Sequence, residues 1–243
     1  KIQLQDGKEG YVAGEYINVV NRISGKNRFE VAVNISNQGW PEKADTVILT
    51  NYTAYADALA ASPLAYQEDA PILLTHQDRL SVETKAELNR LKPKKIIIVG
   101  GTGSVDENVA KELTNEGYSN IERIGGKNRY EVSYRIAQRV SNTDTAIVVD
   151  GRNFPDALAI APYAAKNGYP ILLANGNNLP DETIQALKEK QIQNTIVVGG
   201  NASVGNDVYI QLPSPQRISG KDRYEVAANV IRDLNLNTSS VYI

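Results

Sequence analysis

The chain has 243 residues, and its 26 lysines and arginines stand against 28 aspartates and glutamates, giving a formal net charge of −2. This balance provides no global positive field that would attract nucleic acid or a membrane surface. The absence of cysteine excludes zinc ribbons, thiolate catalysis and disulfide scaffolds, and no apolar run approaches the roughly 20 residues of a membrane-spanning helix.

One motif recurs three times along the chain. It reads RISGKNRFEVA from Arg22, RIGGKNRYEVS from Arg123 and RISGKDRYEVA from Arg217, with spacings of 101 and 94 residues. These spacings indicate a reused unit the size of a small domain, and repetition favours a binding role, because multiplying a weak site raises avidity. The predicted boundaries are a leading segment at 1–20, repeats at 21–121 and 122–216, and a partial third repeat at 217–243.

Helices and strands are predicted to alternate within each repeat. The motif opens a helix at 29–36, with Asn27 as N-cap and Glu30 three residues later, and the other copies keep this pattern. Next in the first repeat come a strand at 46–50, an Ala-rich helix at 55–66, a strand at 71–75, a helix at 81–91 and a strand at 95–101. The second repeat has the same order at 145–149, 154–165, 170–174, 180–190 and 195–200.

Strands separated by helices of this length need crossover connections, which predicts a parallel sheet. The fold class is therefore α/β, with tandem small Rossmann-like parallel-sheet domains that are pseudo-symmetric. The third copy, from Arg217 to Ile243, has room for one helix and one strand. Because so short a segment cannot bury a core alone, we expect it to pack on the preceding repeats.

Glycines after the last strand of each repeat invite comparison with a dinucleotide or phosphate-binding loop. Gly100, Gly101 and Gly103 lack the G-x-G-x-x-G spacing and the Lys-Ser or Lys-Thr of a P-loop. In the second repeat, Gly199 and Gly200 are followed by asparagine and alanine. We therefore predict strand-ending turns here.

Other catalytic candidates are weak. His76 is the only histidine and corresponds to Asn175 in the second repeat, so we interpret it as a surface turn residue. Asp57 and Asp156 recur at the starts of the Ala-rich helices, where a general base or cation ligand is possible, but a helix cap explains the same recurrence and is favoured. We predict no catalytic residue, metal site or cofactor.

The strongest candidate site is a basic cluster in each motif. These clusters comprise Arg22, Lys26 and Arg28; Arg123, Lys127 and Arg129; and Arg217, Lys221 and Arg223. The second arginine of each cluster falls in the first turn of a helix, where backbone amides and the dipole also attract anions. Ion pairs with Glu30, Glu131 and Glu225, or contacts that join the repeats, are equally compatible with the pattern, so both interpretations stay open.

The ordered motifs RISGKNRFEVA, DALAASPLA, PILLT and IIIVGG resemble the type 2 cell-wall-binding repeat of Gram-positive surface proteins, over Arg22 to about Pro215. The resemblance implies three repeats about a pseudo-threefold axis that anchor a secreted protein non-covalently at the cell surface. The implied partner is an anionic cell-wall polysaccharide or teichoic-acid-like polymer. It also implicates the arginines above and the Ile-Leu-Leu stretches, which are Ile72, Leu73 and Leu74, and Ile171, Leu172 and Leu173; we expect these apolar residues to shape a cleft wall or a contact between repeats.

Two other classes of function remain open. The repeats could assemble with one another or with surface-layer proteins, or the glycine turns could belong to a nucleotide-sugar-handling enzyme of Rossmann type. Residues 6–20, DGKEGYVAGEYINVV, also resemble the end of a bacterial SH3-like module. The chain is expected to be a piece of a longer wall-associated protein.

Overall fold

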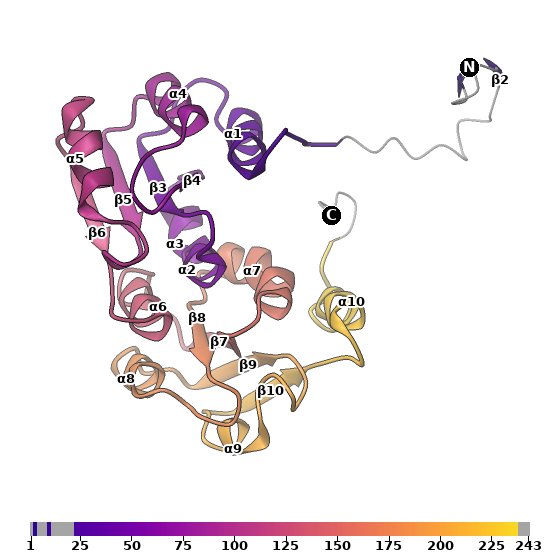
Figure 1. Ribbon diagram of the computed structural model, residues 1–243. Helices are drawn as coiled ribbons and strands as arrows, with labels where there is room; N and C mark the ends of the chain where they lie inside the picture. Colours follow the sequence, from indigo (N-terminus) through magenta and orange to yellow (C-terminus); the bar gives the residue numbers. More distant parts are fainter. Residues whose placement is uncertain (1, 4–8, 11–21, 238–243) are drawn as a thin grey trace.

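The computed structural model describes residues 2–3, 9–10 and 22–237 of the chain. Two four-stranded parallel sheets with their helices form two pseudo-symmetric halves, drawn in indigo to magenta and in orange to yellow in Figure 1. Before Arg22 only a short antiparallel pair is described, β1 (Ile2–Gln3) with β2 (Glu9–Gly10). Apart from β2, the segment for which an SH3-like module was predicted lies outside the described residues.

The first half has the strand order β4-β3-β5-β6, with all strands parallel. In chain order its elements are α1 (Arg28–Gly39), β3 (Thr46–Asn51), α2 (Tyr55–Ala60), α3 (Ser62–Gln67), β4 (Ile72–Thr75), α4 (Val82–Leu91), β5 (Lys95–Val99), α5 (Glu107–Asn115) and β6 (Ile121–Ile124).

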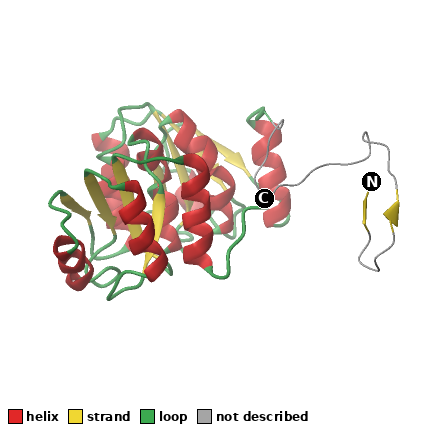
Figure 2. Ribbon diagram, turned by 90° about the horizontal axis from the view of Figure 1, so that it is seen from above, coloured by secondary structure: helices red, strands yellow, loops and turns green. Residues whose placement is uncertain are grey.

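The second half repeats this topology in the order β8-β7-β9-β10. Its elements are α6 (Arg129–Ala137), β7 (Thr145–Asp150), α7 (Pro155–Asn167), β8 (Ile171–Ala174), α8 (Asp181–Glu189), β9 (Asn194–Val198), α9 (Asn206–Tyr209) and β10 (Pro215–Ile218), followed by α10 (Arg223–Asp233). Figure 2 shows helices in front of and behind the strands, as parallel sheets require. The predicted α/β architecture is confirmed.

In the second and third copies the first two residues of the motif belong to a strand, where the sequence predicted a turn, whereas in the first copy they do not. Arg123 lies on β6 and Arg217 on β10, each the fourth strand of the preceding sheet. The Ile-Glu-Arg-Ile of β6 escaped notice because an edge strand of four residues carries little apolar signal. The two sheets consequently end at Ile124 and Ile218, a few residues beyond the boundaries drawn from the motif.

The Ala-rich helix of the first repeat is divided into α2 and α3, whereas one helix was predicted. Pro63 has no N–H to donate and stands in the first turn of α3, so the chain turns at Ala61. In the second half the equivalent Pro162 lies inside the continuous helix α7.

Both faces of each sheet are buried. On β3, Val47 and Leu49 pack with α4 and α5, whereas Ile48 faces α2, α3 and α6. The alternation is repeated on β7, where Ile147 and Val149 point toward α7 and α10. These fully buried β-branched and leucine side chains explain why the strands read as continuous apolar runs.

Helix α6 belongs to both halves. Its Val132 and Ile136 pack in the core of the first sheet, while Ala137 packs in the core of the second. Helices α3 and α7 also pack along each other at this junction.

The helix of the third motif packs on the second half, as predicted. Val226 and Val230 of α10 are buried in the same core as α7. The strand predicted to follow α10 lies outside the described residues.

Candidate functional site

The three motif helices share one capping arrangement. Asn27, Asn128 and Asp222 are the N-caps, and each accepts a hydrogen bond from the backbone N–H three residues later at 2.8–2.9 Å. The motif glutamates accept from the backbone N–H of Lys26, Lys127 and Lys221 at 2.6–2.8 Å. The ion pairs with motif arginines that the sequence left open are not formed among the described residues, and Glu131 pairs instead with Arg135, outside the motif, at 2.6 Å.

The first arginine of the second and third motifs is an internal brace. Arg123 donates to the carbonyl oxygen of Val105 at 2.7 Å and pairs with Glu107 at 3.2 Å. Arg217 donates to the carbonyl oxygen of Gly199 at 2.7 Å, and its guanidinium lies over the Tyr209 ring. Both hold the turn that ends the neighbouring strand, so their guanidinium groups are directed into the protein.

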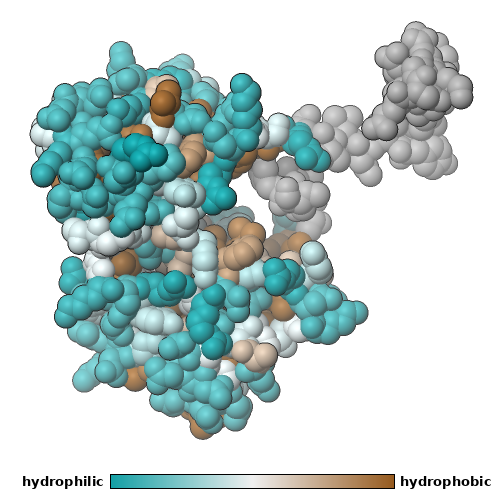
Figure 3. Space-filling model, viewed as in Figure 1, coloured by the Kyte–Doolittle hydropathy of each residue, from teal (hydrophilic) through white to brown (hydrophobic). Residues whose placement is uncertain are grey.

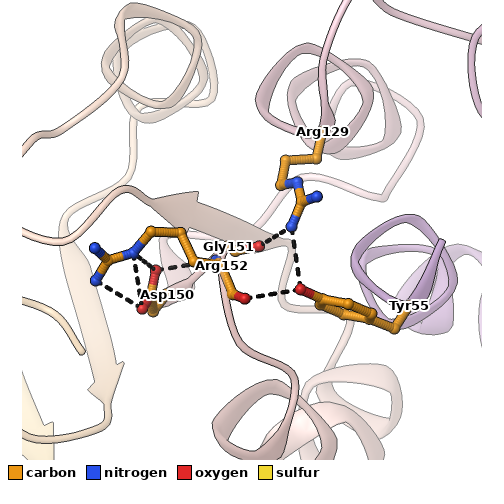
Figure 4. A network of polar contacts seen from close by, with 5 residues as sticks. All are labelled: Tyr55, Arg129, Asp150, Gly151 and Arg152. Carbon is orange, nitrogen blue, oxygen red and sulfur yellow. Dashed lines mark hydrogen bonds and ion pairs between the residues drawn. The ribbon is translucent and has the colours of Figure 1, made fainter. Parts of the chain in front are cut away.

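The second arginine of the motif differs between copies. Figure 4 shows that Arg129 of α6 donates both to the carbonyl oxygen of Gly151 and to the hydroxyl of Tyr55, the latter at 3.3 Å. The Tyr55 hydroxyl in turn donates to the carbonyl oxygen of Arg152 at 2.7 Å, and Arg152 pairs with Asp150. Tyr55 belongs to the first half and the loop at 151–152 to the second, so Arg129 joins the halves.

The remaining motif cations are exposed. Arg28 is exposed, although it donates to the carbonyl oxygen of Tyr52 at 3.3 Å and its guanidinium lies over the Tyr52 ring. In the part of the chain that the structure describes, no ion pair engages the side chains of Arg22, Lys26, Lys127, Lys221 or Arg223. These groups stand at or beside the amino ends of α1, α6 and α10, where an anion would also meet backbone N–H groups.

The Ile-Leu-Leu stretches are strands of the core. Leu73 and Leu172 have no exposed surface, and Ile171 and Leu173 are 1% and 2% exposed. Ile72 and Leu74 are half-buried. Helix α1 packs on β4 and α6 packs on β8, so the buried side chains position the motif helices and offer no surface to a ligand.

A cleft of about 400 Å³ lies at the carboxyl ends of β3 and β5, beside the amino end of α6. Gly100 ends β5 with a φ of +126°, which confirms the predicted strand-ending turn. A side chain on Gly101 would lie 2.3 Å from the carbonyl oxygen of Gly126, so backbone packs directly on backbone here. This close approach packs the second motif against the first sheet. The backbone around Gly101 therefore does not form an open phosphate-binding loop.

Two polar groups in the cleft have no protein partner. Asp57, the third residue of α2, is 7% exposed and lines the cleft, and its carboxylate accepts no hydrogen bond from the described residues. Burial raises the pKa of its carboxyl group to about 6, opposed by the charge of Arg129. The Oγ atom of Ser104, also lining the cleft, is buried and unpartnered. Asp57 is not the N-cap of α2, because Ala54 occupies that position without a side-chain hydrogen bond, but it does lie in the first turn, which was the other predicted place.

His76 lies in the turn after β4, half-buried, and its ring also belongs to an aromatic cluster that the sequence did not predict. Its ring centroid lies 4.7 Å from that of Phe29 and 5.4 Å from that of Tyr52. This contact holds α1 on the first sheet. In the second half Tyr130 is the counterpart of Phe29, and its ring packs on Gly151.

The described residues contain neither a cluster of metal ligands nor a membrane-spanning helix. Over 22–237 and the two short strands before them, no group of three or more His, Cys, Asp or Glu could hold a metal ion. No helix in the same ranges has the length and apolar character needed to cross a bilayer.

The chain matches a family of known proteins twice. The family model described as cell wall binding domain 2 (CWB2) matches residues 22–110 and 123–209. Among solved structures, Cwp6 from Clostridium difficile has a TM-score of 0.81 and 33% identity, over 90% of this chain and 38% of that one. Cwp8 from the same organism has a TM-score of 0.79 and 36% identity, over 86% of this chain and 37% of that one.

Two curated relatives come from Bacillus subtilis (strain 168). N-acetylmuramoyl-L-alanine amidase LytC is 47% identical over 226 residues, which is 93% of this chain and 45% of the relative. Amidase enhancer is 41% identical over 233 residues, which is 95% of this chain and 32% of the relative. The chain thus spans less than half of the length of either protein.

Proposed function

Because this chain belongs to the cell wall binding domain 2 family, we propose that it anchors a secreted protein non-covalently at the Gram-positive cell surface. The proposed partner is an anionic secondary polymer of the wall, a polysaccharide or teichoic-acid-like chain. The segment supplies attachment and no catalysis.

The observation that supports this proposal is the exposed cation at the amino end of each motif helix. Lys26, Lys127 and Lys221 recur at equivalent positions, and no carboxylate among the described residues pairs with their side chains. A phosphate or carboxylate on the polymer would meet both the ammonium group and the helix dipole there. Arg22, Arg28 and Arg223 extend the same exposed set, whereas Arg123 and Arg217 are left out of the proposed contact because they brace turns.

The Ile-Leu-Leu strands support this arrangement indirectly. They form the surface on which α1 and α6 pack, so they fix where the basic residues stand. We propose that their contribution to polymer binding acts through this positioning.

The relatives fit an attachment role. The amidase and the amidase enhancer match this chain over nearly its whole length, yet each is more than twice as long. We propose that the activities their names describe belong to the parts outside the match, and that the matched part brings them to the wall.

Retention on purified walls tests the proposal. The triple variant Lys26→Glu, Lys127→Glu, Lys221→Glu should lose retention on walls that carry their anionic polymer. A matched control reverses three exposed lysines outside the motifs, Lys43, Lys111 and Lys188, and changes the net charge equally. Equal retention of the wild type on intact walls and on walls stripped of the polymer would refute the proposal.

Assembly with other repeats or surface-layer proteins is the second candidate, supported by exposed apolar side chains. Phe154 and Leu158 at the start of α7 are 45% and 55% exposed, and Tyr224 of α10 is 79% exposed. Figure 3 shows apolar residues gathered in the hollow between the two halves, against hydrophilic outer faces. Analytical ultracentrifugation separates the candidates, since self-assembly predicts a concentration-dependent mass that Leu158→Glu reduces.

A further inference from the structure

We infer that the cleft between the two halves is a subsite for a single sugar unit, whose hydroxyl groups bond to Asp57 and Ser104. An anionic substituent of the same or the next unit would lie against Lys127 and the amino end of α6. This inference rests on the proposed function, because it names the part of the wall polymer that the cleft recognises.

The first argument is that buried polar groups are normally satisfied. Asp57 is 7% exposed, and its carboxylate accepts no hydrogen bond from the described residues but keeps access to the cleft, whereas the Oγ of Ser104 is buried and unpartnered. Both line the same cleft. An unmet carboxylate and an unmet hydroxyl beside each other match the hydroxyl groups of a carbohydrate, which donate to the first and exchange donor and acceptor roles with the second.

The second argument comes from the other half of the molecule, where the same residue types lie together around Gly199. Asp156 and Ser203 occupy the equivalent positions, and burial raises the pKa of Asp156 while a hydrogen bond from Ser203 opposes that rise. A side chain on Gly199 would lie 2.5 Å from the Asp156 carboxylate, so the carboxylate closes over its own turn. In the first half the corresponding groups, the Asp57 carboxylate and the Ser104 hydroxyl, line a cleft and remain free to bond to a ligand.

The third argument is the fit of the cleft. Its volume of about 400 Å³ lies within the range of about 300–1,000 Å³ typical of small-molecule sites. The lining also includes Asn51, Gln77 and the ring of Tyr55, which suit a ligand with polar edges and an apolar face. A single carboxylate with no second acidic ligand among the described residues does not suit a metal ion.

The cleft is composite, which explains why one repeat is not sufficient. Asn51, Asp57 and Ser104 come from the first repeat, whereas Lys127 and Arg129 come from the motif of the second. Arg129 fixes the two parts together through Tyr55 and Gly151. A sugar bound here is held by both repeats at once.

Calorimetry on the full chain tests the inference, with anionic polymer extracted from purified Bacillus subtilis walls as the probe. Asp57→Asn should weaken binding at least about tenfold, because it removes a charge-assisted hydrogen bond, and Ser104→Ala should weaken it several-fold. The matched controls Asp156→Asn and Ser203→Ala should bind within about twofold of the wild type. The backbone amide signals of Gly101, Gly103 and Gly126 should shift in NMR spectra on titration with neutral glycosides released from the same polymer by dephosphorylation.

The outcomes separate this inference from the proposed function. If the wild type fails to bind the polymer, the proposed function fails. If the wild type binds but Asp57→Asn and Ser104→Ala bind equally well and the glycine amides do not shift, the subsite is refuted while the function stands. A purely structural role for Asp57 predicts a lower melting temperature for Asp57→Asn; we expect a melting temperature at least as high as the wild type, because the variant removes an unpaired buried carboxylate.

Discussion

Replacing Asp57 by asparagine should remove a pH-dependent loss of stability. The carboxyl group titrates at about 6 in the folded protein and at 3.8 as an ordinary aspartate. Below pH 3.8 it is protonated in both the folded and the unfolded chain, and its neutral form is tolerated in the cleft. Between pH 3.8 and about 6 the folded chain still holds a proton that the unfolded chain has released, so the free energy of unfolding falls over this range and levels off above it.

The size of this effect follows from the two pKa values. Their difference corresponds to about 3 kcal/mol, reached once the pH is above about 6. Asp57 is only 7% exposed, so solvent screening reduces this free-energy difference only slightly. In Asp57→Asn the stability difference from the wild type should therefore move by about 2 kcal/mol in favour of the variant between pH 4 and pH 7, because part of the change has already occurred by pH 4.

Urea unfolding at a series of pH values measures the difference directly. Trp40, the only tryptophan, lies in the first half and reports unfolding there by fluorescence. Ser104→Ala is the control, because it alters the same cleft without a titrating group and should differ from the wild type by the same amount at every pH. A constant difference between Asp57→Asn and the wild type from pH 4 to pH 7 would refute the account of the buried carboxylate.

Four further results are expected. Arg129→Ala should lower the free energy of unfolding by about 1–3 kcal/mol, because it leaves the carbonyl oxygen of Gly151 and the Tyr55 hydroxyl short of a donor. Arg223→Ala should leave urea unfolding unchanged and weaken wall retention, because its side chain is exposed. Equal loss of stability in both variants would contradict the roles of Arg129 as a brace and Arg223 as a polymer contact. Arg217→Ala should destabilise by a similar 1–3 kcal/mol without a change in polymer affinity per folded molecule, as calorimetry on the folded fraction would verify. Gly101→Ala should cost about 1–3 kcal/mol in thermal unfolding, because its methyl group meets the carbonyl oxygen of Gly126 at 2.3 Å; a neutral effect would show that the turn relaxes freely. Retention of the wild type on walls should fall steadily as salt rises from about 0.05 to 0.5 M, because exposed cations are screened, and salt-independent retention would point to an apolar contact instead.

Much of the fold could be predicted because its signals are local. The β-branched runs at Thr46–Asn51 and Thr145–Asp150 are buried on both faces, so their composition alone marks them as inner parallel strands. The caps at Asn27, Asn128 and Asp222 were predicted for the same reason, since the residues that make each hydrogen bond lie three positions apart.

The site was harder to predict because it depends on contacts far apart in the sequence. Arg123 and Arg129 look equivalent as cations of one motif, yet the first turns inward to Val105 and the second reaches Tyr55, 74 residues away. Asp57 looked like a helix cap because caps and buried carboxylates share the same position in the first turn. Only the packing of Gly100 and Arg129 around it distinguishes the two roles.

The Ile-Leu-Leu stretches show the opposite problem. A motif can be shared within a family for structural as well as functional reasons. Here Leu73 and Leu172 are buried beneath α1 and α6. Periodicity had already suggested core strands for them. The structure supports that simpler interpretation of the sequence.

Helix α6 contributes to the cores of both sheets, so the repeat seen in the sequence and the unit that folds are out of phase. A protease cut or truncation near Gly126 would remove packing that the core of each half needs, so neither half would fold on its own. The two halves should melt in one cooperative transition. In many multidomain proteins a flexible linker separates neighbouring domains, but here the two repeats share α6. When the protein is attached to a cell wall under turgor, tension on one repeat is therefore carried by its neighbour as well.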